Sequence, residues 1–131
     1  MTQRILVADT PEGDRRISAI LSGYDLVLVR TLGEAQRILR REKFALVLVG
    51  VHFDDSRMFD LVRVLRGDEL HAGVPIVCVR GRPGFTAVTG RTLELTLKAL
   101  TADEFIDLVH FGDDEAGNAA LRAAVERLLR A

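Results

Sequence analysis

The residues that could do chemistry in this sequence follow two runs of apolar residues. Asp9 ends the segment RILVAD, and His52 and Asp54 come soon after the run 44–49. A histidine and two carboxylates are a donor set that can hold a metal ion. Isolated donors of this kind on loops are more often simply solvated, so the sequence favours no metal site. The position directly after the second run is Gly50, which offers no functional group.

A further candidate is Arg80, which follows the apolar run 76–79. A guanidinium there can pair with the carboxylate of Asp9, or it can swing out to solvent, and the sequence leaves both interpretations open. The loop after it, GRPGFTAVTGRT, carries Arg82 and Arg91 among glycines whose amides could surround an anion. The loop lacks the lysine-serine ending of a nucleotide-binding P-loop.

A regular alternation of strands and helices is expected to position these residues. Four short runs are apolar on both faces, as strands are when helices cover both sides of a sheet, and they span residues 5–8, 26–29, 44–49 and 76–79. Helical spacing fills the segments between them, and Asp54, Asp55 or Ser56 is expected to cap the third helix. The pattern predicts one α/β domain over residues 1–131, with a doubly wound, five-stranded parallel sheet. Ligands of such sheets bind beyond the carboxyl ends of the strands.

The segment 92–99 has two interpretations. Strict alternation in TLELTLKA predicts a strand, after which a helix would begin at Ala102. Alternatively, Leu93, Leu97 and Leu100 lie on one face of a fourth helix, and residues 105–108 form the fifth strand. We prefer the helix, because the apolar C-terminal helix then completes a fifth strand–helix unit.

Composition excludes several classes of protein. The chain has 131 residues, of which 48% are hydrophobic and 28% charged, with a net charge of -1, so neither nucleic acid nor a membrane surface is an expected partner. The single cysteine, Cys78, cannot form an internal disulfide. With no leader-like segment and no run long enough to span a membrane, the expected location is the cytoplasm.

In this order of elements the chain resembles the receiver domain of bacterial response regulators, the CheY-like superfamily. RILVADT is similar to the family's first strand with its acidic pair, and FALVLVG to the strand that bears the phosphorylated aspartate. VPIVCV resembles the fourth strand, and TADEFIDL the segment that holds the fifth. The resemblance implies a flavodoxin-like three-layer sandwich.

The positions that this family uses for chemistry carry other residues here. Its members phosphorylate an aspartate with the help of a divalent cation, a hydroxyl and a lysine. The resemblance assigns the acidic pair to Asp9 and Thr10, the phosphoacceptor to Gly50, the hydroxyl to Arg80 and the lysine to Leu108. If residues 92–99 are a strand, Lys98 takes the lysine position instead. Either way the nucleophile is missing, which implies a degenerate pseudo-receiver that is not an enzyme and holds no metal or cofactor.

Two functions follow from these interpretations. The first is a signalling module of a two-component or phosphorelay pathway that binds a protein partner, or a second copy, without being phosphorylated. Receiver domains dock through their fourth helix, fifth strand and fifth helix, where this chain has Leu95, Ala99 and Phe105. The ring of Phe105 is expected to stay buried, since burial of a phenyl group contributes roughly 1.5–3 kcal/mol. The alternative is a binder of a small anion or nucleotide, through Arg80 and the two arginines of the loop after it.

Overall fold

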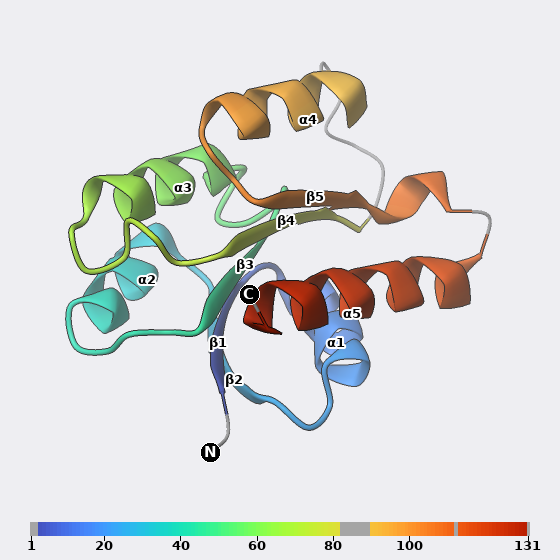
Figure 1. Ribbon diagram of the computed structural model, residues 1–131, viewed down its shortest axis with the longest axis horizontal. Helices are drawn as coiled ribbons and strands as arrows, with labels where there is room; N and C mark the ends of the chain where they lie inside the picture. Colours follow the sequence, from blue (N-terminus) through green and yellow to red (C-terminus); the bar gives the residue numbers. More distant parts are fainter. Residues whose placement is uncertain (1–2, 82–89, 112, 131) are drawn as a thin grey trace.

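The structure, a computed structural model, describes residues 3–81, 90–111 and 113–130 (Figure 1). Within these residues, strands and helices alternate along the chain. The strands are β1 (Arg4–Ala8), β2 (Asp25–Val29), β3 (Leu46–Gly50), β4 (Ile76–Arg80) and β5 (Glu104–Asp107). The helices are α1 (Pro11–Ile20), α2 (Leu32–Leu39), α3 (Met58–Gly67), α4 (Gly90–Ala99) and α5 (Asp114–Arg130), with a short 3-10 turn, η1 (Leu108–His110), before α5.

All five strands pair in parallel, in the order β2-β1-β3-β4-β5. Helices α1 and α5 cover one face of the sheet, and α2, α3 and α4 cover the other (Figure 1). This arrangement confirms the predicted doubly wound α/β fold. The strand order reverses at β1, between β2 and β3, so the residues that follow β1 and β3 lie at the crevice where such sheets bind ligands.

Apolar side chains fill two cores, one on each face of the sheet. Cys78 is fully buried in β4, and burial raises its pKa to about 12, so the thiol has little tendency to ionise or react. Phe44, predicted to begin the third strand, lies two residues before β3 but is buried in the same core. No helix among the described residues is long and apolar enough to cross a membrane.

The ambiguous segment 92–99 is helical. Leu93 and Leu97 are buried on one face of α4, as the preferred interpretation requires, whereas Leu100 follows the helix and is only partly buried against the same core. The alternative, a strand followed by a helix from Ala102, is wrong. The amides of Thr101 and Ala102 donate to carbonyls in the last turn of α4 at 2.9 Å, a Schellman ending that releases the chain into β5.

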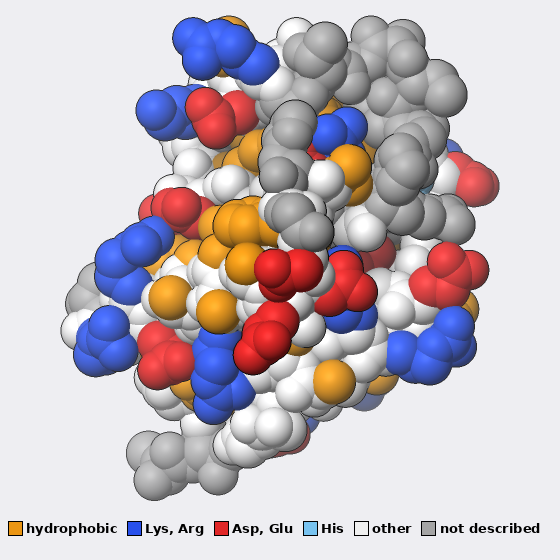
Figure 2. Space-filling view, turned by 90° about the vertical axis from the view of Figure 1, so that its right-hand side faces the viewer, with side chains coloured by type: hydrophobic (Ala, Val, Ile, Leu, Met, Phe, Trp, Pro, Cys, Tyr) orange, Lys and Arg blue, Asp and Glu red, His pale blue; other side chains and the backbone are white. Residues whose placement is uncertain are grey.

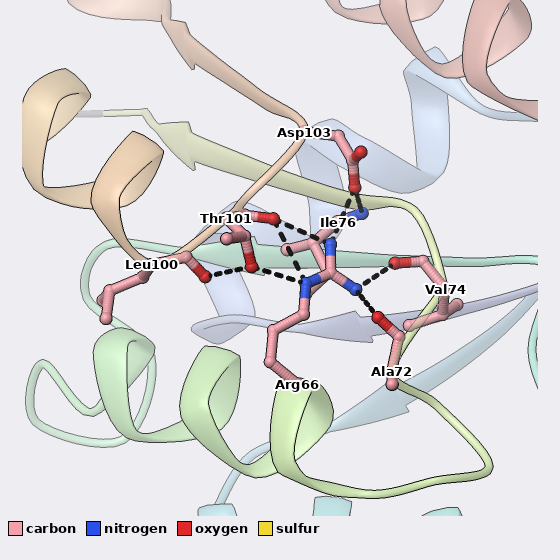
Figure 3. Close-up of polar contacts among 7 residues, drawn as sticks. All are labelled: Arg66, Ala72, Val74, Ile76, Leu100, Thr101 and Asp103. Carbon is pink, nitrogen blue, oxygen red and sulfur yellow. Dashed lines mark hydrogen bonds and ion pairs between the residues drawn. The ribbon is translucent and has the colours of Figure 1, made fainter.

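Thr101 ends this helix in a left-handed conformation, with φ 66°, which a β-branched residue adopts only at a cost. A guanidinium from the last turn of α3 holds it there (Figure 3). Arg66 donates to the carbonyl and hydroxyl oxygens of Thr101 at 2.9 to 3.1 Å. It also donates to the carboxylate of Asp103 and to the carbonyls of Ala72 and Val74. One side chain therefore ties α3 to the segments that lead into β4 and β5.

Replacing Arg66 with alanine should lower the free energy of unfolding by about 1–2 kcal/mol, because several of these charge-assisted bonds face solvent, where water can replace them. Urea denaturation of the variant measures the loss. Arg63→Ala is the matched control, since Arg63 lies on the same helix and makes one contact of 3.4 Å, to Asp60. Equal losses in the two variants would show that the contacts of Arg66 contribute nothing specific.

Candidate functional site

The carboxyl edge of the sheet brings together residues that are distant in the sequence. Ala8 is paired with Val49, which places Asp9 beside Gly50. On the other side of β3, Gly50 is paired with Val79. Arg80, the next residue of β4, therefore lies at the same edge of the sheet. Figure 2 views this end of the molecule, where acidic and basic side chains are interspersed around apolar ones.

The buried carboxylate of Asp9 lies between two glycines. A Cβ built on Gly50 would fall 2.1 Å from one carboxylate oxygen of Asp9 and 2.5 Å from the other. A Cβ on Gly13, in the first turn of α1, would fall 2.1 Å from Oδ2. Neither position can carry a side chain while Asp9 stays there. Gly50 therefore lacks a functional group and also lacks room for one, because the carboxylate of Asp9 occupies the space that a side chain would need.

Thr10, at the second position of the acidic pair, caps α1. Its hydroxyl oxygen accepts a hydrogen bond from the amide of Gly13 at 3.2 Å, and Pro11 takes the first helical position. The amide of Thr10 itself donates to Oδ1 of Asp9 at 2.7 Å. Its role in this structure is therefore to begin the helix and to orient Asp9.

Arg80 binds Asp107, and this corrects both sequence interpretations, which had it pair with Asp9 or project into solvent. Its Nε and Nη2 donate to the two carboxylate oxygens of Asp107 at 2.9 and 2.6 Å. The side chains are only 11% and 8% exposed. The physical reason is strand register, because Arg80 and Asp107 are direct partners at the ends of β4 and β5. Asp107 also accepts from the amide of Val109, so it fixes η1 as well.

Asp54 caps a different helix from the one expected. Its Oδ2 accepts from the amide of Leu32, the first residue of α2, at 2.8 Å. Helix α3 instead follows Arg57, whose side chain makes no capping bond. Three consecutive residues, Asp54, Asp55 and Ser56, have positive φ angles of 43°, 54° and 68°. This left-handed turn separates the aspartates from the start of α3, so the predicted cap of α3 is wrong.

A small cleft of about 110 Å³ opens at this edge, beside Asp9. Its lining residues are Asp9, Thr10, Glu12, Gly13, Arg16, Val51, His52, Val79 and Gly81. Arg16 was missed by sequence reasoning, which looked for function at strand ends and not along α1. Its Nε donates to Asn118 at 2.9 Å, whereas its buried Nη2 makes no hydrogen bond and lies 3.6 Å from Asp114.

Three other predicted site residues, Arg82, Arg91 and Leu108, have separate outcomes. Arg82 is outside the described residues, and Arg91 is exposed in the first turn of α4 and does not line the cleft. Leu108, at the family's lysine position, is buried against α5. Within the described ranges, no three His, Cys, Asp or Glu side chains are grouped as metal ligands.

The predicted interaction face is partly apolar. Leu95 is 52% exposed and Ala99 is exposed, so both lie off the buried face of α4 as expected. Phe105 is half-buried and packs against the core, so the expectation of a fully buried ring was too strong. Its exposed part lies beside a depression of about 240 Å³ that Glu94 and Lys98 also line.

Several solved structures that resemble this chain are receiver domains or response regulators. The receiver domain of a signal transduction histidine kinase from Syntrophus aciditrophicus is 23% identical, with a TM-score of 0.77, and the match covers 98% of this chain and 91% of that one. The receiver domain of a sensor histidine kinase from Pseudomonas aeruginosa, solved with magnesium in its active-site cleft, is 21% identical over the full length of both chains, with a TM-score of 0.76. A putative response regulator from Chloroflexus aurantiacus reaches a TM-score of 0.79 at 13% identity, again over both full lengths. No protein-family model and no curated protein sequence matches the chain. These likenesses show the fold of receiver domains.

Proposed function

We propose that this chain is a pseudo-receiver, a module of a two-component or phosphorelay pathway in the cytoplasm that acts by binding another protein and is not phosphorylated. The likeness to receiver domains of histidine kinases and response regulators supports the signalling role. The observation that carries the rest is the carboxylate of Asp9, which fills the space where a side chain at residue 50 would lie.

Of the groups that phosphoryl transfer to a receiver needs, all except the carboxylate of Asp9 have been replaced. Gly50 provides no nucleophile, and the neutral Thr10 is engaged in capping α1. Arg80 stands in place of the hydroxyl and is held by Asp107, while Leu108 stands in place of the lysine. An attacking carboxylate, a metal and cationic or hydroxyl donors must act together, so the loss of all but one carboxylate leaves no route to the phosphorylated state.

Treatment with acetyl phosphate and magnesium should therefore leave the mass of the protein unchanged. Intact-mass spectrometry measures this directly, and a receiver domain with its aspartate in place, treated in parallel, shows that the phosphodonor is active. Addition of a phosphoryl group to any aspartate of this chain would overturn the proposal.

The surface proposed for the partner is the one formed by α4 and β5. Leu95→Glu places a charge at its most exposed apolar side chain and should abolish partner recovery from a lysate of the native host. The melting temperature should change little, because Leu95 is outside the core. Leu70→Glu is the matched control, since Leu70 is 59% exposed on the loop between α3 and β4. If both variants recover the same partner as the unmodified chain, the docking surface lies elsewhere.

One observation favours a second candidate, the binding of a small anion in the cleft. The buried Nη2 of Arg16 makes no hydrogen bond, although its residue lines the cleft beside Gly13 and Gly81. A volume of about 110 Å³ suits a group of a few atoms and not a whole nucleotide. A thermal shift with inorganic phosphate or acetate that disappears in Arg16→Gln would favour this function. If none of the anions tested shifts the melting temperature, anion binding is ruled out and protein binding remains the proposed function.

A further inference from the structure

The outer edge of β2 has the features of a strand that accepts another strand. β2 is at the end of the sheet and pairs with β1 through one edge, in unbroken register. Leu28 is 44% exposed, and Leu26 and Val27 are half-buried. Natural sheets protect such edges with proline, an inward-pointing lysine or a bulge, and the strand DLVLV has none of these.

A groove of about 350 Å³ runs beside this edge, between β2 and α2. Its lining residues are Val27, Leu28, Val29, Glu34, Arg37, Ile38, Arg41 and Glu42. Glu42 is already bound by Arg4. Among the residues that the structure describes, Arg37 and Arg41 have no ion-pair partner. The flank of α2 thus offers cationic side chains that are available to an acidic group of a second molecule.

We propose that β2 pairs in antiparallel fashion with β2 of a second copy of this chain, about a two-fold axis at Val27. Residues opposite each other in an antiparallel pair share a face of the sheet. Leu26 lies on the α1 and α5 side, and alternation puts Leu28 there as well. Leu28 of each copy would then lie against Leu26 of the other, and the two five-stranded sheets would become one continuous sheet.

The two ends of the strand carry opposite charges, which favours an antiparallel arrangement over a parallel one. Asp25 begins β2 and Arg30 directly follows it, so antiparallel pairing brings the acidic end of each strand near the basic end of the other, with Asp25 opposite Val29 and one position out of register with Arg30. Both side chains remain partly exposed, although Arg4 and Asp14 contact them within the chain.

The charges of α2 fit the same axis. Glu34 lies in its first turn and Arg41 just beyond its end, and both line the groove. The two-fold axis reverses one helix relative to the other, so Arg41 of each copy approaches Glu34 of its mate. Apolar contacts at the centre with charged pairs at the rim are the usual anatomy of an interface. A second copy would therefore contribute backbone hydrogen bonds to β2, an apolar contact to Leu28 and opposite charges to Glu34 and Arg41.

A five-residue strand edge and one helix flank make a small interface, so the dimer should be weak and depend on concentration. Sedimentation velocity over a concentration series measures it. Leu28→Lys should weaken dimerisation by at least about tenfold, because a lysine on the edge loses the leucine contact and opposes pairing. Leu70→Lys, at an exposed leucine that is neither on β2 nor in the lining of the groove, should dimerise like the unmodified chain.

Three outcomes would overturn the inference. The unmodified chain could stay monomeric at every concentration that remains soluble, or Leu28→Lys could dimerise as well as Leu70→Lys. In the third outcome, Leu95→Lys abolishes a dimer that Leu28→Lys retains, which would place the contact on α4. None of these results bears on whether acetyl phosphate modifies the chain, so this inference and the proposed function fail separately.

A mixing experiment tests the direction of the pairing. Arg41→Glu and Glu34→Lys each put like charges together in their own dimers, so each variant alone should dimerise less than the unmodified chain. An equimolar mixture restores both opposite-charge contacts and should dimerise again. Circular dichroism of each variant checks that it is folded, since Glu34 is part of the capping box of α2. A mixture that associates no better than its components would rule out the antiparallel register.

Discussion

Replacing Gly50 with alanine is expected to lower the free energy of unfolding by about 2–3 kcal/mol. In an ordinary strand the same change would be favourable, because glycine is the costlier residue there. Here the new methyl carbon would fall 2.1 to 2.5 Å from the carboxylate atoms of Asp9. Asp9 cannot retreat toward α1, since Gly13 already touches it from that side. The carboxylate must leave its position or the strands must separate.

Urea denaturation of Gly50→Ala gives this loss, and Gly67→Ala is its control. Gly67 ends α3, and a Cβ there would meet nothing within 4 Å, so the control should be neutral or slightly stabilising. The identity of the obstacle is tested in an Asp9→Ala background. If the carboxylate is what collides, Gly50→Ala should cost little once Asp9 has been truncated. An unchanged cost would mean that the collision is with other atoms.

Replacing Arg80 with alanine should destabilise the protein by about 3–4 kcal/mol. The change removes two charge-assisted hydrogen bonds from the carboxylate of Asp107, whose side chain is only 8% exposed. Arg80→Lys should recover only part of the loss, because an ammonium group cannot make the paired contacts of a planar guanidinium. The double variant Arg80→Met with Asp107→Leu should be close to the unmodified chain in stability, since both charges leave together.

The ion pair between Arg127 and Glu104 provides the comparison for this experiment. It also joins β5 to a neighbouring element, but its side chains are 57% and 33% exposed. Arg127→Ala should therefore cost no more than about 1 kcal/mol. If Arg80→Ala costs no more than Arg127→Ala, the pair at the carboxyl edge is too well solvated to fix β4 against β5.

The fold could be predicted because its signals are local. Runs that are apolar on both faces and helical spacing between them determine the order of elements, and that order limits the topology to a parallel sheet. Even the ambiguous segment 92–99 was decided correctly by counting elements.

The contacts of the site could not be predicted in the same way. Whether Arg80 meets Asp9 or Asp107 depends on register, which is set by the packing of whole strands. The cap formed by Asp54 depends on three successive left-handed residues, none of which is glycine. The sequence does show that Gly50 has no side chain, but only the structure shows what fills its place.

The placement of Asp9 between Gly13 and Gly50 also affects how a carboxylate could return to residue 50 during evolution. A single substitution there meets Asp9 and loses stability at once, so selection would remove it before any benefit appeared. Clearing the space first means moving or truncating Asp9, the one member of the acidic pair that remains. A side chain can therefore return to residue 50 without loss of stability only after Asp9 has changed.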